Sequence, residues 1–285
     1  MSLTTKFGHI TGIRSDRPLS DEAIMRVAPS IFTESKYESR SERYTWIPTI
    51  QVLNGLRREG FQPFMVCQAR VRQIARRAHT RHMIRLRHEG QITGQEANEI
   101  ILINSHDGSS SYQMLAGLFR FVCANGMVCG DTLSDLRVPH KGDVVGRVIE
   151  GAFGVLDGFE RVNTQREAMQ SLTLTEGEQG ALARAALSLK YDADDGPAPI
   201  TADQLLLPRR PEDHRPDLWT TFNRVQENMI KGGLRGRART GRPTTSRAVT
   251  GIDQSIKLNR ALWVLADEMR RLKTSGSEGA AASAL

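Results

Sequence analysis

The sequence predicts an α+β protein, with a small antiparallel sheet and a long packed helix followed by a mainly helical C-terminal half. Residues 99–104 are apolar on both faces and rich in isoleucine, which is typical of a strand inside a sheet. From Tyr112 to Val122, apolar side chains recur at helical spacing. The polar segment 105–111 between them predicts a turn, so strand, turn and buried helix form the expected core.

The chain divides into four predicted parts. Residues 1–19 show no sustained hydrophobic period and are expected to form a loose N-terminal arm. Residues 20–143 form the α+β core, and residues 144–273 form a mainly helical region packed on it. Residues 274–285 lack a sustained apolar face and are expected to form a disordered tail.

Within the core, local signals mark two helices and two further strands. Ser20 is a capping residue for a short helix, and Pro48 suits the first turn of a helix that ends at Gly60. Residues 61–72 and 82–88 alternate between apolar and polar side chains, which predicts two strands with one buried face each.

The C-terminal half carries the clearer helix signals. Four glycines interrupt the apolar pattern of a long helix predicted over 144–170. Thr175 and Glu178 form a capping box for the next helix. Asp217 caps a third helix, which ends at a glycine pair, and residues 253–272 predict a final helix with an apolar face.

Length and composition bound the class of protein. At 285 residues the chain is long enough for one large or two smaller cores. No apolar run is long enough to cross a bilayer, and the N-terminus lacks the apolar region of a signal peptide. Cys67, Cys123 and Cys129 lie in apolar patterns and predict buried thiols, with a disulfide or a reactive site as the alternative. We therefore expect a cytoplasmic protein with no membrane partner.

The positive charge is concentrated in two segments. Residues 70–88 carry seven arginines and three histidines with no acid, and residues 231–247 carry one lysine and five arginines with no acid. Because these cations exceed the net charge of +7, the rest of the chain is mildly acidic. Such localisation predicts a surface for a polyanion rather than a generally basic surface.

The first basic segment overlaps the two alternating strands. If they share a sheet with residues 99–104, apolar side chains pack on the helix and arginines line the open face. A cationic open face suits a phosphate backbone, whereas a solvated edge whose arginines prevent aggregation is the alternative. The candidate nucleic-acid-binding residues of this segment are Arg70, Arg72, Arg76, Arg77, Arg81, Arg85 and Arg87.

The second basic segment contains glycines that allow close approach of a backbone and arginines spaced to reach successive phosphates. A disordered loop with incidental charge is the alternative. Because helices pin both of its ends, we expect it to bind the same strand as the arginine face. Tyr37, Tyr44 and Trp46 are candidates for base stacking or for core packing. The candidate binding residues of this segment are Lys231, Arg235, Arg237, Arg239, Arg242 and Arg247.

His106 and Asp107 form the most enzyme-like pair, because adjacent His and Asp side chains can supply two metal ligands. The other histidines show no recognisable ligand spacing, since His79 and His82 resemble a zinc motif only loosely, and His-Asp-Gly is ordinary turn chemistry. No phosphate-binding loop or dinucleotide motif is present in the sequence. We predict no catalytic residue, no metal and no cofactor; a metal-dependent nuclease or phosphoesterase using His106 and Asp107 is the alternative.

Six ordered motifs carry a family resemblance. They are SERYTWIPT (41–49), NSHDGSSS (104–111), GLFRFVCANG (117–126), WTTFNRVQEN (219–228), GGLRGR (232–237) and GID (251–253). Together they resemble the bacterial family known as domain of unknown function 932, over about residues 20–272. The resemblance implies a plasmid or prophage origin, where single-strand binding and annealing proteins occur, and it implies no established activity.

The expected order of strand, basic hairpin, strand and long helix also resembles the core of RecT/Red-beta-like annealing proteins. That architectural resemblance implies a single strand held in a basic groove, and it allows a homo-oligomer. We therefore expect a nucleic-acid-binding protein of a mobile element that binds single-stranded DNA, with strand annealing in recombination as an extension. A host-factor inhibitor acting by protein–protein contact is a further alternative.

Overall fold

The computed structural model describes most of the chain, in two compact units. The described residues are 3–7, 10–38, 46–88, 96–121, 125–129, 136–138, 144–192, 194 and 196–282. Tyr44, Val122 and Cys123 lie outside them. Unit 1 comprises Met1–Glu160 with Thr250–Ile252, and unit 2 comprises Arg161–Val249 with Asp253–Leu285.

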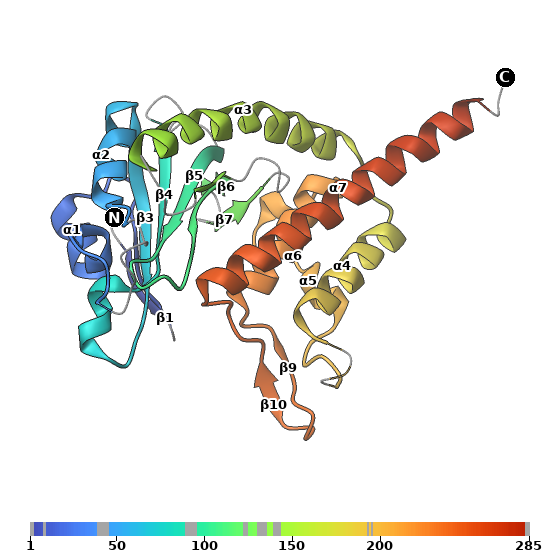
Figure 1. The fold of residues 1–285 in the computed structure, drawn as a ribbon. Coiled ribbons are helices and arrows are strands. Elements are labelled where there is room, and N and C mark those ends of the chain that lie inside the picture. The colour runs from blue at the N-terminus through green and yellow to red at the C-terminus, as the bar shows by residue number, and fades with distance from the viewer. Residues whose placement is uncertain are drawn as a thin grey trace. The chain divides into compact units, whose positions relative to one another are not determined.

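Unit 1 is built on an eight-stranded antiparallel sheet (Figure 1). Strands β1 to β7 lie side by side in chain order, and β8 also pairs with β6. Their bounds are β1 Leu3–Phe7, β2 Ile10–Arg14, β3 Phe61–Ala69, β4 His82–His88, β5 Glu96–Asn104, β6 Tyr112–Arg120, β7 Asn125–Val128 and β8 Leu136–Val138. The predicted strands are therefore confirmed over 61–69, 82–88 and 99–104, and the sheet is larger than expected. Residues 70–72 lie beyond β3, and β4 is buried on both faces rather than on one.

The N-terminal segment is part of this sheet. β1 and β2 form an antiparallel hairpin, and β2 pairs with β3 from Ile10 opposite Ala69 to Arg14 opposite Met65. The prediction of a loose arm over residues 1–19 is wrong for this hairpin. Its strands are too short to show a hydrophobic period by themselves, and a sheet edge that they join supplies the missing partner.

The prediction of a helix that starts at Tyr112 is wrong, because these residues form the strand β6. Ile101 of β5 lies opposite Leu115, and Leu102 lies opposite Met114. β6 is buried on both faces along most of its length, so its apolar residues are nearly continuous. A continuous apolar run fits helical and extended periods equally well, and its neighbours in the sheet decide between them.

Three helices pack on one face of the sheet in unit 1. They are α1 Asp21–Val27, α2 Thr49–Arg58 and α3 Val144–Ser171; the short 3₁₀ segment η1 Pro29–Phe32 lies between α1 and α2, and η2 Ile74–His79 lies between β3 and β4. Ile24, Leu53 and Val148 from these helices share one hydrophobic core with Ile84 and Ile100 of the sheet. Ser20 caps α1 as predicted, because its Oγ accepts a hydrogen bond from the amide of Ala23. The long packed helix of the fold is thus α3.

Unit 2 is mainly helical (Figure 1). Its elements are α4 Glu176–Lys190, α5 Ala202–Leu205, η7 Pro211–His214, α6 Leu218–Lys231, β9 Arg235–Arg237, β10 Pro243–Thr245 and α7 Ile252–Ala282. The capping box of Thr175 and Glu178 and the cap at Asp217 are both confirmed. The helical backbone of α7 continues to Ala282, so the prediction of a disordered tail from residue 274 is wrong up to that point.

α6 lies at the centre of unit 2, because every residue from Leu218 to Met229 is buried. Its aromatic side chains meet α7: the ring centroids of Trp219 and Trp263 lie 6.2 Å apart, and those of Phe222 and Trp263 lie 6.0 Å apart. The predicted α+β class, with a mainly helical C-terminal half, is confirmed. Among the described residues, no helix combines the length and the apolar character that crossing a membrane requires.

Candidate nucleic-acid interface

The second basic segment folds as a two-stranded antiparallel ribbon rather than as a loop. Arg235 of β9 lies opposite Thr245 of β10, and Arg237 lies opposite Pro243. The amide of Ala238 donates to the carbonyl of Arg242 at 2.9 Å and closes the turn between the strands. We call residues 235–245 the arginine hairpin.

The arginine hairpin has one attached face and one exposed face. Alternation leaves Arg235 and Arg237 exposed, whereas Gly236 faces the chain before α5. The amide of Arg237 donates to the carbonyl of Pro199 at 2.9 Å. A Cβ on Gly236 would lie 1.7 Å from that carbonyl oxygen, so only glycine fits there. The sequence predicted that a backbone approaches this glycine closely, and in the structure that backbone is the protein's own, at Pro199.

Hydrogen bonds to other parts of unit 2 fix the base of the hairpin. Gly232 has a φ of +63° and ends α6, and the amide of Gly233 donates to the carbonyl of Ser246 at 2.8 Å. The Nζ of Lys190 donates to the carbonyls of Met229 and Arg247 at 2.7 and 2.8 Å. These bonds join the end of α4 to both ends of the basic segment, so the hairpin projects from a fixed base (Figure 1).

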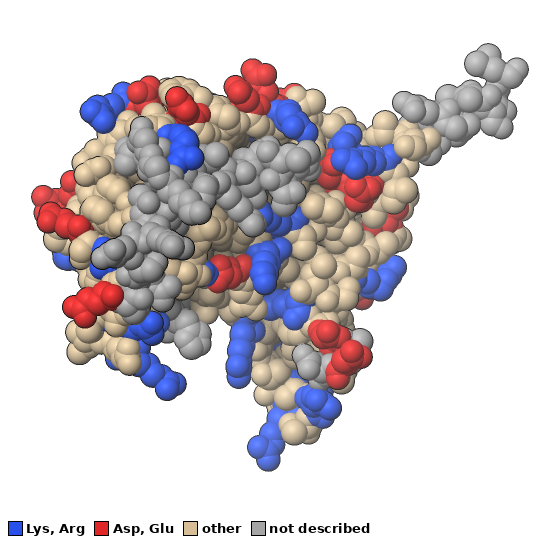
Figure 2. Space-filling view, in the orientation of Figure 1, with Lys and Arg blue, Asp and Glu red and all other residues tan. Residues whose placement is uncertain are grey.

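The Lys and Arg side chains of the segment are exposed, and an acidic side chain pairs with Lys231. Arg239, Arg242 and Arg247 are exposed, as are Arg235 and Arg237. Figure 2 shows Lys and Arg side chains near the free end of the projection that the hairpin forms. Lys231 instead pairs with Glu227 of α6, one helical turn earlier, with 2.7 Å between its Nζ and the carboxylate. Its charge is therefore matched within unit 2, although the basic segment itself contains no acid.

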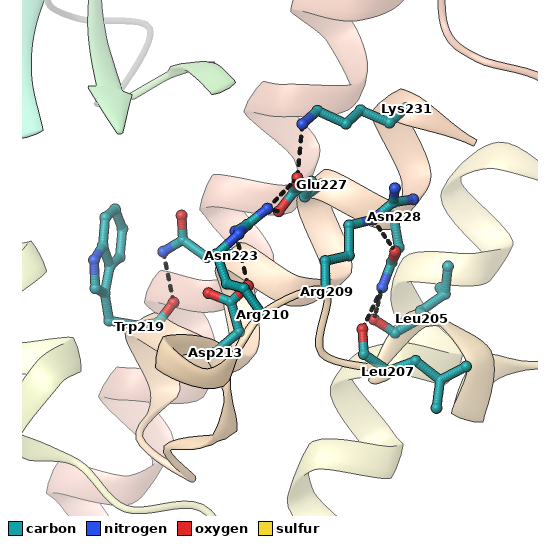
Figure 3. Close-up of polar contacts among 10 residues, drawn as sticks. All are labelled: Leu205, Leu207, Arg209, Arg210, Asp213, Trp219, Asn223, Glu227, Asn228 and Lys231. Atoms are coloured by element: carbon teal, nitrogen blue, oxygen red, sulfur yellow. Dashed lines mark hydrogen bonds and ion pairs between the residues drawn. The ribbon is translucent and has the colours of Figure 1, made fainter. Parts of the chain in front are cut away.

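A buried ionic cluster supports α6 next to this base (Figure 3). Arg210 donates to both carboxylate oxygens of Glu227, at 2.7 and 2.9 Å, and to Asp213 at 2.7 Å. Burial raises the pKa of Glu227, but the bonds from Arg210 and Lys231 outweigh that effect and hold the pKa below its ordinary value. A paired buried carboxylate of this kind keeps the helix end in one position.

A second set of bonds ties α6 to the segment around α5. Arg209 donates through Nε to the Oδ1 of Asn228 at 2.7 Å (Figure 3). Through a terminal nitrogen it also donates to the carbonyl of Gly232 at 3.0 Å. The Nδ2 of Asn228 donates to the carbonyls of Leu205 and Leu207 at 2.9 and 3.0 Å. Sequence reasoning missed these supporting residues, because each acts on a carbonyl or amide remote in the chain and leaves no local pattern.

The first basic segment comprises the connection between β3 and β4, residues 70–81, and β4 itself. Arg70, Arg72 and Arg77 are exposed, and Arg76 lies over the ring of Tyr37, with its Cζ 5.4 Å from the ring centroid. Arg81 donates to the carbonyl of Ser109 at 2.5 Å and remains partly exposed. We call residues 70–81 the basic loop; its exposed arginines are the part of the segment that meets solvent.

Arg85 and Arg87 do not line an open face, and that prediction is wrong. They are 6% and 1% exposed and both donate to Glu99, at 2.5 and 2.8 Å. Burial lowers the pKa of Arg87, and Glu99 opposes that shift. The guanidinium of Arg87 also lies 3.8 Å from the ring centroid of Phe119. The acid was missed because β5 brings Glu99 directly opposite Arg87 from outside the acid-free segment.

His106 and Asp107 complete a turn that borders a buried polar network. The Oδ1 of Asp107 accepts the amide of Ser109 at 2.9 Å, which is the turn chemistry expected of His-Asp-Gly. The amides of His106 and Asp107 donate to the carbonyl of His79 at 2.9 and 3.1 Å. The ring of His106 is buried, with its centroid 5.3 Å from that of His82.

His82 has both ring nitrogens engaged. Its Nδ1 lies 2.8 Å from the Oγ of Ser30, and its Nε2 lies 2.9 Å from the Oγ1 of Thr49. Burial, aided by the nearby His106, lowers the pKa of His82 to about 3. Within the described ranges, no group of three or more His, Cys, Asp or Glu side chains is arranged to hold a metal ion.

The aromatic and thiol candidates have structural surroundings. Trp46 lies 6.1 Å from the ring of His106, centroid to centroid, and Tyr37 lies 5.3 Å from that of His79. Cys67 and Cys129 are buried free thiols, as predicted. Burial raises the pKa of Cys67 to about 12, so it is a poor nucleophile.

Comparisons with known proteins agree with the motif resemblance. UPF0380 protein YfjQ of Escherichia coli (strain K12) is 60% identical over 267 residues, which cover 94% of this chain and 97% of that protein. UPF0380 protein YafZ of the same strain is 59% identical over 267 residues, with the same coverage. No solved structure matches the chain. The architectural resemblance to RecT/Red-beta-like proteins has lost its basis, because the helix on which it depended is β6. Residues 36–263 match the family model described as Domain of unknown function (DUF932), and the chain belongs to that family.

Proposed function

We propose that this protein binds nucleic acid, and single-stranded DNA in particular, through the arginine hairpin. The observation that carries the proposal is a ribbon of exposed arginines on a fixed base. Arg235, Arg237, Arg239 and Arg242 are exposed, and no acid occurs from residue 231 to 247. Arginine binds phosphate through parallel donors on a planar group, which favours it over lysine in such a role.

The ribbon geometry supports contacts to successive phosphates. Residues two apart on a strand point to the same side, with about 6.6 Å between their Cα atoms. Arg235 and Arg237 have this relation and both point away from Pro199. Because Gly236 and Ser246 hold the backbone, binding loses little conformational entropy in ordering the hairpin. Phosphate contacts of this kind give affinity without sequence preference.

The basic loop of unit 1 is the second proposed contributor. Its exposed arginines are Arg70, Arg72 and Arg77. Arg85 and Arg87 are no longer part of the proposal, because both pair with Glu99 and both are buried. Strand annealing and a role on mobile elements extend the proposal, and the motif resemblance is their support.

A charge-matched comparison tests the proposal. One variant carries Arg235→Ala, Arg237→Ala and Arg239→Ala, and its control carries Arg17→Ala, Arg26→Ala and Arg58→Ala. The control removes the same net charge from exposed arginines outside both basic segments. Gel shifts use single-stranded and duplex DNA of one sequence, with and without magnesium.

The expected result is tighter binding of the single strand, a loss of more than tenfold in the hairpin variant and a small change in the control. Equal losses in both variants would show that net charge alone attracts DNA, and unchanged binding by the hairpin variant would contradict the proposed site. Magnesium-dependent loss of substrate would instead favour the nuclease or phosphoesterase alternative.

A further inference from the structure

The basic loop carries an unusual apolar side chain at its surface. Ile74, the first residue of η2, is 88% exposed, which is the largest fraction of any exposed large hydrophobic side chain among the described residues. Val71, three residues earlier, is 38% exposed. Isolated exposed aliphatic residues are common on proteins, so exposure alone carries little meaning. The surroundings of Ile74 make it informative.

Cations surround this aliphatic side chain in the sequence. Arg70 and Arg72 precede it, Arg76 and Arg77 follow it, and no acid occurs from residue 70 to 88. Three of these four arginines are exposed, and Arg76 is partly exposed. The loop therefore presents an exposed aliphatic side chain that is flanked in the chain by four arginines.

Hydrogen bonds anchor the ends and the second half of the basic loop, whereas its first half is exposed. The amide of Ala69 donates to the carbonyl of Arg81 at 2.8 Å, and the Nε2 of Gln68 donates to the carbonyl of Arg77 at 2.6 Å. The amide of His106 donates to the carbonyl of His79 at 2.9 Å. These bonds hold the second half of the loop on the sheet while residues 71–75 remain exposed.

We infer that Ile74 is a wedge that inserts between neighbouring bases of a bound nucleic acid, while the adjacent arginines hold the phosphates on either side. This inference rests on the proposed function and adds a mode of binding to it. Proteins that distort nucleic acid use single aliphatic side chains in this way, because one base step accepts one side chain. The cost of unstacking is offset by phosphate contacts that the arginines make.

Other partners fit the loop less well. Binding to a membrane surface scales with apolar area, and two aliphatic side chains separated by Arg72 and Gln73 offer little of it. A stable protein interface buries about 800 Å² on each partner around an apolar centre that is depleted in charge. The alternation of cations with single aliphatic residues is the opposite arrangement. Charge complementarity to a polyanion with planar apolar bases is the better match.

The test uses the fluorescence of 2-aminopurine, which rises when the base loses its stacked neighbours. Adenine-rich single strands carry one 2-aminopurine each, at successive positions. The variants are Ile74→Ser, which removes the aliphatic side chain, and Ile74→Leu, which keeps one. Met25→Ser is the matched control, because Met25 is an apolar residue of the same unit that is 50% exposed on α1. Both sites are exposed, so we expect all three variants to fold.

We expect a severalfold rise in fluorescence for the unaltered protein, for Ile74→Leu and for Met25→Ser. Ile74→Ser should bind within a few-fold of the unaltered protein in gel shifts and give little rise. Binding without any rise in the unaltered protein, or the same rise with Ile74→Ser, would overturn the wedge and leave the proposed function standing. An absence of binding to any strand would overturn both. Binding to anionic vesicles that Ile74→Ser alone abolishes, without a change on DNA, would assign Ile74 to a membrane and overturn the wedge.

Discussion

At the scale of single residues, Glu99 has the most demanding position in unit 1. It is fully buried between Arg85 and Arg87, and its two oxygens accept one bond from each. Gly126 faces the guanidinium of Arg85, where a Cβ would lie 2.6 Å from its Cζ. The site thus holds two positive charges and one negative charge in a closely packed space. Removing the negative charge leaves two buried cations without their counter-ion.

Glu99→Gln should therefore destabilise the protein by about 3–5 kcal/mol, which is the usual cost of breaking a buried ion pair from one side. The amide keeps the shape of the carboxylate, so the loss reports charge rather than volume. Chemical denaturation measures it, with Glu150→Gln at an exposed position of α3 as the control. A loss of less than about 1 kcal/mol would contradict the view that Glu99 compensates both arginines.

His82 predicts how stability responds to acid. Burial lowers its pKa from the ordinary histidine value of 6.5 to about 3 in the folded protein. Between these two pH values the unfolded chain therefore binds more protons than the folded protein. The contribution of His82 to stability is fully present above pH 6.5 and decreases as pH falls toward 3. The contribution is at most about 1.4 kcal/mol per pH unit for one group.

The measurement is the free energy of unfolding at pH 7 and at several pH values across the window that the shift defines, from 6.5 down to about 3. A His82→Gln variant should be less stable at pH 7, because Ser30 and Thr49 lose their ring partners. Its stability should also decline less steeply with acid. Parallel pH profiles for both proteins would show that His82 is not the group that responds.

At the scale of elements, the arginine hairpin depends on one glycine. Gly236 allows β9 to lie against Pro199, and Gln204 adds a bond from its Nε2 to the carbonyl of Arg235 at 2.8 Å. The GGLRGR motif had suggested that these glycines admit a phosphate. The structure gives Gly236 a different purpose, since it attaches the ribbon and leaves the arginines on the outer side.

Gly236→Ala should release this attachment without unfolding the unit. The added Cβ would lie 1.7 Å from the Pro199 oxygen, and the hairpin must move away to accommodate it. Hydrogen exchange at the amide of Arg237, which donates to Pro199, should become much faster. Gly154→Ala is the control, because no atom lies within 4 Å of its Cβ position. Unchanged protection of Arg237 in the Gly236 variant would contradict the attachment.

Elements with local signals were predictable, and elements defined by distant partners were not. Thr175 with Glu178, and Asp217, mark helix starts within four residues of chain, and α4 and α6 begin as predicted. Leu115 and Phe119 of β6 fit a helical period equally well, and only pairing with β5 makes them extended. Arg87 likewise looked solvent-facing until β5 placed Glu99 opposite it. Of the candidate site, the exposed arginines of 235–242 were predictable, because an acid-free run with glycine needs no distant information.

At the scale of the whole molecule, the α+β class and the helical C-terminal half followed from composition and pattern, while the distribution of surface charge did not. The two basic segments contain thirteen cations, but two of the arginines are buried and the lysine is paired with Glu227. The number of exposed cations, rather than the formal net charge, determines how strongly salt weakens binding to a polyanion.

Binding to a single-stranded oligonucleotide should weaken linearly with the logarithm of salt concentration, because bound cations release counter-ions from the strand. Replacing Arg235, Arg237 and Arg239 by alanine should reduce the slope of that line by about 2, the value expected for three lost phosphate contacts on a single strand. Fluorescence anisotropy at several salt concentrations measures both slopes. A weaker affinity with an unchanged slope would mean that these arginines act on the fold of the hairpin rather than on phosphates.

The strand order of unit 1 has a consequence for how the sheet assembles. Each neighbouring pair from β1 to β7 joins strands that follow one another in the chain. Contacts between nearby segments close short loops, which costs little entropy and favours rapid folding. Only the pairing of β2 with β3 must wait for a long insertion, which carries α1 and α2. During synthesis each strand after β3 therefore emerges beside a completed edge, and the sheet grows by one fresh edge at a time.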